Sequence, residues 1–241
     1  MNFTITTRHE AGDVQSERTE YIQPDRRRGE YPVSEGPRVV LITRCDRGLG
    51  YRLNLDDREF SCFPLPHYPT DAELRATGAD AMLPADPPKP TVIVETTTVD
   101  TGERKEAFGF TARRVIVTCR HIPLTDASRP QETTEDGWYI DLDPTISCER
   151  WWPTDGPRGH VFLSATITGD EAPEIPQFTD IGAPETGFAI ELESVEVSRD
   201  TLPDGTTKEF RHSWTTRVTA LSTEPIDARL FEVPEGFREV E

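Results

Sequence analysis

The sequence predicts a mainly β protein built on a strongly curved antiparallel sheet, an incomplete barrel, with one to three short helices on its concave side. Val, Ile, Thr and Phe crowd residues 91–121, and such side chains suit a pleated, half-buried surface. The 21 prolines indicate many connections and few long helices. Runs that alternate apolar and polar side chains recur along the chain, and a sheet with this many strands must curl. We expect one domain over residues 1–241, since all-β domains often reach this length.

The first quarter of the chain predicts a meander of short strands. Alternation favours a strand over residues 2–8 and a second over 17–31, interrupted by a turn or edge bulge at Pro24-Asp25. Three more strands, separated by polar turns, are expected over residues 39–45, 50–55 and 59–65. Strands this close in sequence pair with their neighbours.

One helix candidate precedes the central stretch. Residues 70–76 suit a helix because Thr70 can cap its start and Glu73 stands three residues later. A proline-rich connection over residues 84–90 then leads to residues 91–121. The sequence Asp100-Thr101-Gly102-Glu103 breaks that stretch near its middle. A break containing Gly between two β-rich runs predicts a hairpin of two long antiparallel strands.

The rest of the chain predicts strands separated by acidic, proline-bearing loops. We expect loops over residues 123–136 and 169–184, and one helical turn within 146–152. The turn signal Pro203-Asp204-Gly205 separates two long alternating runs. The expected strands are 137–142, 161–168, 186–199 and 208–222, and residues 226–231 close the chain.

The net charge of −18 is unevenly distributed. Residues 131–241 hold 8 Lys and Arg against 24 Asp and Glu, a net charge of −16, so the first 130 residues are close to neutral. A field of this sign repels phosphate backbones, which argues against nucleic acid as a partner despite the run Arg26-Arg27-Arg28. We interpret the acidic half as a solvated surface, because no stretch has the spacing of a calcium loop.

The chain lacks the signature of a membrane-spanning helix. No stretch approaches the ~20 apolar residues that cross a bilayer, so we do not expect a protein integral to the membrane. The sequence also starts without a charged and then apolar leader. Two interpretations stay open: a cytoplasmic protein, or a periplasmic or cell-envelope protein whose signal segment has been removed.

Four cysteines, at positions 45, 62, 119 and 148, contain no Cys-x-x-Cys pair. This spacing argues against a zinc knuckle and is compatible with two disulfides. We expect the pairing that is local in sequence, Cys45 with Cys62 and Cys119 with Cys148. The alternative is four buried free thiols, since free Cys packs well as a small hydrophobe. The five histidines are scattered without a ligand spacing, so we predict no metal and no cofactor.

One short motif carries a catalytic hypothesis. The run Asp141-Leu142-Asp143-Pro144-Thr145 matches the D-x-D-x-T pattern of haloacid dehalogenase-like phosphotransferases, in which the first Asp attacks phosphorus. That chemistry needs a parallel sheet flanked by helices, for which this chain has little helix. The other nucleophile and phosphate-loop motifs are absent, so an enzyme is the minority hypothesis.

Aromatic side chains gather in the middle of the chain. They are Trp138, Tyr139, Trp151 and Trp152, in a chain with four Trp. We interpret them as core residues or as a lid over the open end of the sheet. An alternative is the wall of an apolar ligand pocket.

Several segments resemble known bacterial proteins. Residues 21–31, Cys45-Asp46-Arg47-Gly48 and residues 51–56 resemble the opening of lipoprotein carriers of the LolA/LolB-like fold. Residues 100–105, 108–113 and 230–237 look like an uncharacterised exported bacterial family assigned to that fold. The likeness covers about half of the chain and implies an incomplete barrel whose concave apolar face holds acyl chains.

The resemblance also implies a role for one arginine. In such carriers an Arg on the second strand, within an Arg-Trp-Glu-Tyr-like run, helps to control opening. Arg28-Gly29-Glu30-Tyr31 matches that run except that Gly29 replaces the aromatic residue. The alternative is that Arg28 is an outward charge that protects a sheet edge.

Three functional hypotheses follow. The first is a non-enzymatic envelope protein that binds a lipid, an acylated protein or another apolar ligand in the concavity. The second is a structural or interaction protein whose concavity is filled by its own side chains, and the third is a hydrolase using acidic residues around Asp141. The candidate ligand-binding residues of the first are Arg28, Phe108, Phe110, Trp138, Tyr139, Trp151 and Trp152.

Overall fold

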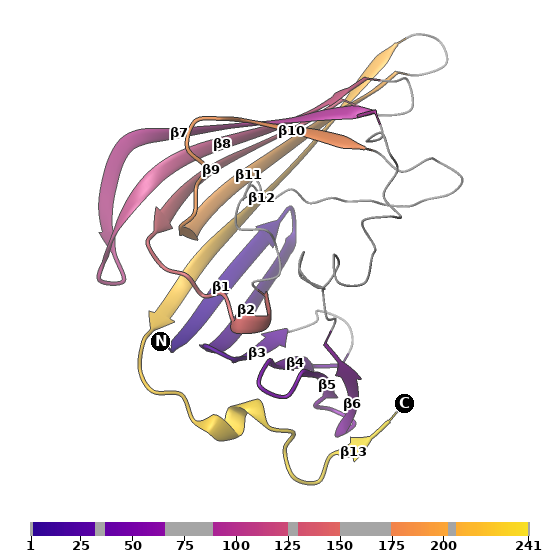
Figure 1. The fold of residues 1–241 in the computed structure, drawn as a ribbon, viewed down its shortest axis with the longest axis vertical. Helices are drawn as coiled ribbons and strands as arrows, with labels where there is room; N and C mark the ends of the chain where they lie inside the picture. The colour runs from indigo at the N-terminus through magenta and orange to yellow at the C-terminus, as the bar shows by residue number, and fades with distance from the viewer. Residues whose placement is uncertain are drawn as a thin grey trace, which may run out of the picture.

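The protein is mainly β, and its strands form a single open sheet (Figure 1). The structure, a computed structural model, describes residues 2–31, 37–65, 89–124, 130–149, 175–201 and 206–240. The thirteen strands of these residues lie in the order β10-β7-β8-β9-β11-β12-β1-β2-β3-β4-β5-β6-β13. All neighbours pair antiparallel except β10 with β7 and β13 with β6. The predicted curved, incomplete barrel is therefore confirmed as an open, mostly antiparallel sheet.

The strands range in length from 2 residues in β13 to 16 residues in β7 and β12. In chain order they are β1 (Phe3–Ala11), β2 (Val14–Gln23), β3 (Arg26–Tyr31), β4 (Val39–Arg44), β5 (Leu49–Asn54), β6 (Glu59–Pro64), β7 (Val92–Ala107), β8 (Phe110–Pro123), β9 (Gln131–Ile140), β10 (Pro176–Ile181), β11 (Phe188–Thr201), β12 (Thr207–Ser222) and β13 (Arg238–Glu239). Two short 3-10 helices complete the elements, η2 (Ser147–Glu149) and η3 (Ala228–Phe231).

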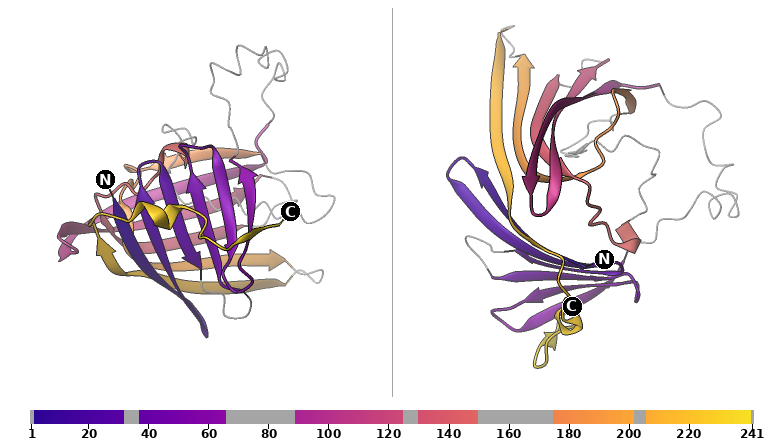
Figure 2. Two further views of the ribbon diagram at one scale, coloured as in Figure 1. Left: turned by 90° about the horizontal axis from the view of Figure 1, so that it is seen from below. Right: turned by 90° about the vertical axis from the view of Figure 1, so that its left-hand side faces the viewer.

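Curvature comes from long strands and from local irregularities in their pairing. The register shifts at Thr6/Thr7 in β1, at Asp100/Arg104 in β7 and at Ala189/Glu191 in β11. An extra residue in one strand bends it and increases its right-handed twist. Strands β7–β9, β11 and β12 form one wall, here the large wall. Strands β1–β6 form a second wall, here the small wall, which faces it across a concave space (Figure 2).

The central hairpin turns at a different place from the predicted one. Asp100 and Arg104 flank a bulge inside β7, and Gly102 there has a φ of 82°. The chain reverses eight residues later than Asp100, at Phe108-Gly109, where φ is 53° and 80°. Two successive residues with positive φ are typical of the type I′ turn, whose twist matches that of the paired strands. The Gly-containing sequence at residues 100–103 therefore marks a bulge and not the hairpin turn, because a Gly with positive φ occurs in bulges as well as in turns.

Most of the other strand predictions are confirmed within a few residues. The meander of β4, β5 and β6 and the pairing of β11 with β12 are as expected. Two expected loops were wrong in part: β9 starts at Gln131 inside the first, and β10 lies inside the second. Both segments are polar enough to resemble loops, yet they pair with apolar strands. The predicted helix 70–76, strand 161–168 and turn 203–205 lie outside the described residues.

A cluster of buried apolar side chains stabilises the convex face of the small wall. Residues 226–240, here the C-terminal segment, cross the outside of this wall (Figure 2), and η3 contacts β3 and β4. The predicted concave helix corresponds to η2, whereas η3 lies on this opposite face. Phe231 of η3 is buried against side chains of β4 and β5, namely Val40, Ile42 and Leu53. Neither described 3-10 helix is long or apolar enough to span a bilayer.

Candidate ligand-binding concavity

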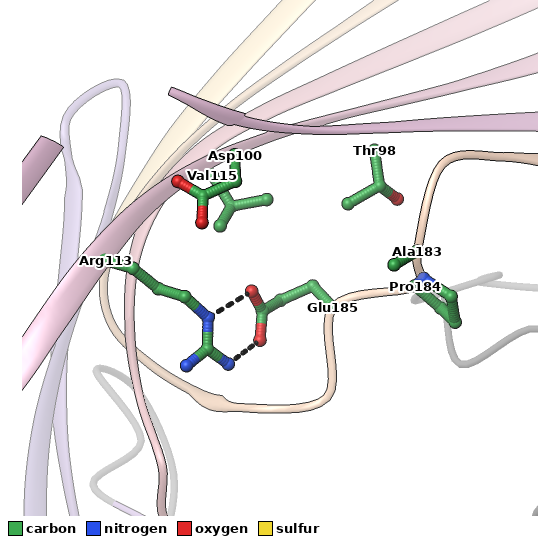
Figure 3. Close-up of a pocket in the computed structure, with 7 residues that line it drawn as sticks. All are labelled: Thr98, Asp100, Arg113, Val115, Ala183, Pro184 and Glu185. Carbon is green, nitrogen blue, oxygen red and sulfur yellow. Dashed lines mark hydrogen bonds and ion pairs between the residues drawn. The ribbon is translucent and has the colours of Figure 1, made fainter. Parts of the chain in front are cut away.

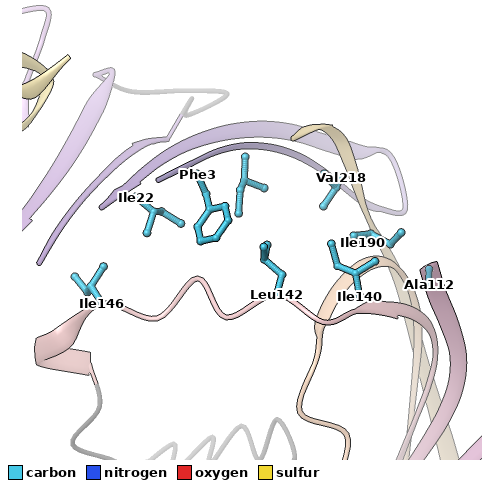
Figure 4. Close-up of a cluster of buried hydrophobic side chains, with 9 residues drawn as sticks. Phe3, Ile22, Ala112, Ile140, Leu142, Ile146, Ile190 and Val218 are labelled. Atoms are coloured by element: carbon cyan, nitrogen blue, oxygen red, sulfur yellow. The ribbon is translucent and has the colours of Figure 1, made fainter. Parts of the chain in front are cut away.

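The concave face carries a buried apolar cluster where β12, β1 and β2 adjoin. Phe3 and Ile5 of β1, Ile22 of β2 and Val218 of β12 belong to it (Figure 4). Phe3 and Ile5 share this cluster because every second side chain of a strand points to the same face. The sheet therefore presents the cluster as a continuous apolar patch rather than as scattered side chains.

A segment whose regular structure is limited to the short helix η2 covers this patch. Residues 141–149, here the concave strap, leave β9 and cross the concave side (Figure 2). Its Leu142 and Ile146 pack into the cluster, and Ile146 has no exposed surface (Figure 4). The apolar surface of this wall is thus covered by two side chains of a strap rather than by a second layer.

Polar contacts of the strap concentrate near the β2–β3 turn. Arg27 Nη2 donates to the carbonyl oxygen of Pro144 at 2.9 Å, and the Ser147 amide donates to the carbonyl oxygen of Pro24 at 2.8 Å. A disulfide joins Cys148 of the strap to Cys45, at the end of β4, with the Cα atoms 5.3 Å apart. The strap is therefore fastened at its far end to the small wall.

The predicted disulfide pairing was wrong. Cys45 bonds to Cys148, whereas Cys62 and Cys119 are free thiols. Cys62 lies on β6 and is exposed, and Cys119 on β8 is half-buried, which raises the pKa of its thiol. Proximity in sequence was a poor guide to the pairing, because the strap crosses the concave side and brings Cys148 next to Cys45, from which it is 103 residues distant in the chain. The alternative of four free thiols is wrong as well.

A second segment crosses the concave side of the large wall. Residues 182–187, here the crossing segment, connect β10 to β11 and pass over β7 and β8 (Figure 3). Arg113 of β8 donates from Nε to Glu185 Oε2 at 2.9 Å, and from Nη2 to the other carboxylate oxygen. A cavity of about 230 Å³ lies beneath the segment. Its lining consists of Thr98, Asp100, Arg113, Val115, Ala183, Pro184 and Glu185 (Figure 3).

The strand register places this cavity and the apolar cluster on the same face. Val115 pairs with Gly137, Gly137 with Leu192, and Leu192 with Thr216. Thr216 and Val218 are two residues apart on β12, so their side chains point to the same side. The concave face therefore changes from apolar near β1 to charged near β8.

Electrostatics on the charged part are dominated by paired groups. Besides Glu185, Arg113 binds Asp141 through Nη1 at 2.5 Å, and the hydrogen bond to Glu185 is the main cause of a raised Arg113 pKa. The hydrogen bond from Arg104, with a second from the Gly102 amide, lowers the Asp100 pKa to about 2. Burial raises the pKa of Tyr139. These shifts keep the three groups in their ordinary charge states at neutral pH, which suits binding better than proton transfer.

Arg28 does not lie in the concavity. It is buried on the convex face, where Nη1 donates to the carbonyl oxygen of Leu230 and Nε donates to Glu30. Its strand β3 is internal to the sheet, between β2 and β4. Both expectations for Arg28, a gate of the concavity and a guard of a sheet edge, are therefore wrong.

Two of the predicted aromatic residues that the structure describes pack against the concave apolar cluster, and two do not belong to it. Phe108 is exposed at the tip of the β7–β8 hairpin, while Phe110 packs against the concave apolar cluster. Trp138 also packs against that cluster, and Lys105 Nζ lies 4.4 Å from the centre of its ring. Tyr139 pairs with Arg113 and is buried. Trp151 and Trp152 lie outside the described residues.

Asp141 and Asp143 occupy the start of the concave strap. Asp141 is 84% exposed and binds Arg113, and Asp143 Oδ1 accepts a hydrogen bond from the Thr145 amide. The surrounding sheet is open and mostly antiparallel, unlike the helix-flanked parallel sheet that the D-x-D-x-T chemistry requires. No group of three or more His, Cys, Asp or Glu within the described ranges is arranged to hold a metal ion.

Sequence reasoning missed the ion pair that fastens the crossing segment. Arg113 and Glu185 are 72 residues apart, and neither was a candidate site residue, although Arg113 ends the run 108–113 that carries part of the resemblance. The cysteines were the sequence signal that could have indicated the strap. A disulfide between Cys45 and Cys148 requires that residues around position 148 cross to the end of β4. Comparison of the sequence with protein-family models and with curated proteins finds no match.

Proposed function

We propose that this protein is a non-enzymatic cell-envelope protein that binds a lipid or another apolar ligand on the concave face of its sheet. The observation that carries the proposal is the covered apolar cluster of β1, β2 and β12. Among the described residues, the cluster is closed by Leu142 and Ile146 of the strap, which precede η2, and not by a strand or a helix. An acyl chain has the chemistry to take the place of these two side chains.

Two further features support the proposal. An open, curved sheet with a covered concave side is the architecture that the resemblance to lipoprotein carriers implies. The Cys45–Cys148 disulfide supports export, because disulfides persist in oxidising compartments such as the periplasm. Export is consistent with a role in the cell envelope.

Native mass spectrometry of gently purified protein tests the proposal. We expect a co-purifying acyl species, and we expect the apolar dye N-phenylnaphthylamine to compete with it. Val218→Thr places a hydroxyl in the cluster and should weaken dye binding about tenfold. The matched control is Val14→Thr, at a 61% exposed position on β2, which should bind dye like the wild type. A bare chain that binds no dye, either with the Cys45–Cys148 disulfide intact or after its reduction, would contradict the proposal.

A second candidate function is a structural or interaction protein of the envelope with a filled concavity. The observation that favours it is that Leu142 and Ile146 already fill the cluster. Under this hypothesis the purified chain carries no ligand, and Val218→Thr affects stability alone. The same mass spectrometry and dye titration therefore discriminate the two functions.

The hydrolase hypothesis has one observation in its favour. Asp141 is accessible and binds Arg113, and a guanidinium is a suitable side chain to bind a phosphate group. Phosphatase activity in the wild type that Asp141→Asn abolishes would support this function. A wild-type protein without such activity contradicts it.

A further inference from the structure

The fastening of the concave strap points to control by thiol chemistry. Three of its attachments lie close together: the disulfide to Cys45, the Ser147 amide on Pro24, and Arg27 on Pro144. The Cys148 amide also lies 3.2 Å from Cys45 Sγ. The Cys45 amide in turn donates to the carbonyl oxygen of Asp25 at 2.9 Å. The Cys45–Cys148 disulfide is therefore next to the hydrogen bonds that join the strap to the small wall.

A further attachment of the strap lies at its other end. The Arg113–Asp141 ion pair is solvent-exposed on the Asp141 side, and such pairs contribute little to stability. Between Asp141 and Ser147 the contacts of the strap with the sheet include the Arg27 bond and the packing of Leu142 and Ile146. The apolar packing is the interaction that a competing acyl chain could replace.

We propose that the Cys45–Cys148 disulfide is a redox switch that locks the concave strap over the apolar cluster, and that its reduction releases the strap and opens the cluster to an apolar ligand. This inference rests on the proposed apolar-ligand function. A dithiol supplies two electrons and two protons: its thiolate attacks one sulfur, the S–S bond breaks, and a second attack yields an oxidised dithiol and two protein thiols. Both half-cystines are only partly buried, so a small dithiol can reach them.

The free cysteines provide a matched control. A Cys62→Ser/Cys119→Ser variant keeps the disulfide and removes the other two thiols. A Cys45→Ser/Cys148→Ser variant removes the switch and keeps the free thiols. Reduction should release the strap in the Cys62→Ser/Cys119→Ser variant as it does in the wild type. In the Cys45→Ser/Cys148→Ser variant the strap should be released without any reductant.

The experiment compares the oxidised and the dithiothreitol-reduced full chain. Hydrogen exchange read by mass spectrometry should show amides of the strap, including Ser147, exchanging on the order of tenfold faster or more after reduction. N-phenylnaphthylamine fluorescence should rise in parallel, while far-UV circular dichroism keeps its β signal. Reoxidation should restore slow exchange and low fluorescence.

The outcomes separate the switch from the binding function. Equal exchange of the strap before and after reduction, with the sheet intact, overturns the switch, as does loss of the whole β signal on reduction. Strong dye binding in both redox states also overturns the switch while it supports the binding function. Faster strap exchange without dye binding supports the release of the strap and contradicts the binding function.

Discussion

Arg44 and Glu232 are 188 residues apart in the chain, yet Arg44 Nη1 donates a hydrogen bond of 2.5 Å to Glu232 Oε1. The same guanidinium binds both carboxylate oxygens of Asp46 and is 2% exposed. It thereby connects the end of β4 to the C-terminal segment on the convex face. The small wall is consequently held from both sides, by the C-terminal segment outside and by the concave strap inside.

Removal of Arg44 should loosen the convex side. Arg44→Met leaves two carboxylates without their main partner, and because both keep some exposure we expect a loss of about 2 kcal/mol in the free energy of unfolding. Urea titration measures this loss. The control is Arg47→Met, which removes a 47% exposed partner of Glu232 and should cost about 0.5 kcal/mol. Equal losses in the two variants would contradict the central role of Arg44.

Stability should fall at acidic pH through the same cluster. Hydrogen bonding by Arg44 lowers the Asp46 pKa, and for Glu232 the Arg44 and Arg47 guanidinium groups outweigh the upward effect of burial. Because the folded-state pKa values are depressed, the stabilisation is complete above the unfolded values of about 4 and is lost as pH falls further. Urea titrations at several pH values should show a steeper acid loss for wild type than for Arg44→Met. Parallel curves would exclude this cluster as the cause.

The crossing segment should tolerate no side chain at Gly182. Its φ is 90°, and an added Cβ would lie 2.4 Å from the carbonyl oxygen of Thr98. Gly12 also has a positive φ, 57°, but a Cβ there meets no atom within 4 Å. We expect Gly12→Ala to cost about 1 kcal/mol for its backbone conformation and Gly182→Ala to cost at least about 2 kcal/mol. Thermal unfolding of both variants tests whether close approach, rather than φ alone, selects Gly182.

The two carboxylates on Arg113 should differ in their contribution. The Glu185 side chain is 8% exposed and binds Arg113 through both oxygens, whereas Asp141 is exposed. We expect Glu185→Gln to lower the free energy of unfolding by about 2 kcal/mol and Asp141→Asn by less than about 0.5 kcal/mol. Denaturant titration provides the comparison. A larger loss for Asp141→Asn would mean that the strap, not the crossing segment, depends on Arg113.

The turn of the central hairpin should gain from a substitution. Phe108 adopts a φ of 53°, an unfavourable conformation for a bulky side chain, and it is exposed. Asn adopts the left-handed conformation readily and suits a type I′ turn before Gly. Phe108→Asn should therefore raise stability by about 1 kcal/mol, and Phe108→Ala, which keeps the backbone cost, should not. Thermal unfolding measures both, and an Asn variant no more stable than wild type would refute this account.

Strand positions were readily predicted because their signal is local. Alternation with a period of two identified β1 and the long strands β11 and β12, and short apolar runs between polar turns identified the meander of β4 to β6. The failures have a common cause. Gly102 could mark a turn or a bulge, and residues 131–136 and 176–181 are polar strands whose pairing partners supply the stabilising contacts. Pairing overrode local preference in each case.

The candidate site was less predictable than the fold. Alternation indicated that each strand has one apolar face, but not which segments cover it. Arg28 shows the consequence: a motif match placed it in the concavity, whereas the register puts it opposite Ile42 on the convex face. A shift by one residue reverses the face of every side chain, so the face cannot be inferred from a short match.

The sequence by itself determined the elements: the positions of most strands, the open, curved character of their sheet, and the acidic charge of the second half. The tertiary structure alone decided the partners: Cys148 for Cys45, Glu185 for Arg113, and the C-terminal segment for the convex face. The reason is physical. Side-chain alternation follows from backbone geometry over a few residues, whereas contacts across 72 to 188 residues depend on register and twist accumulated over many strands.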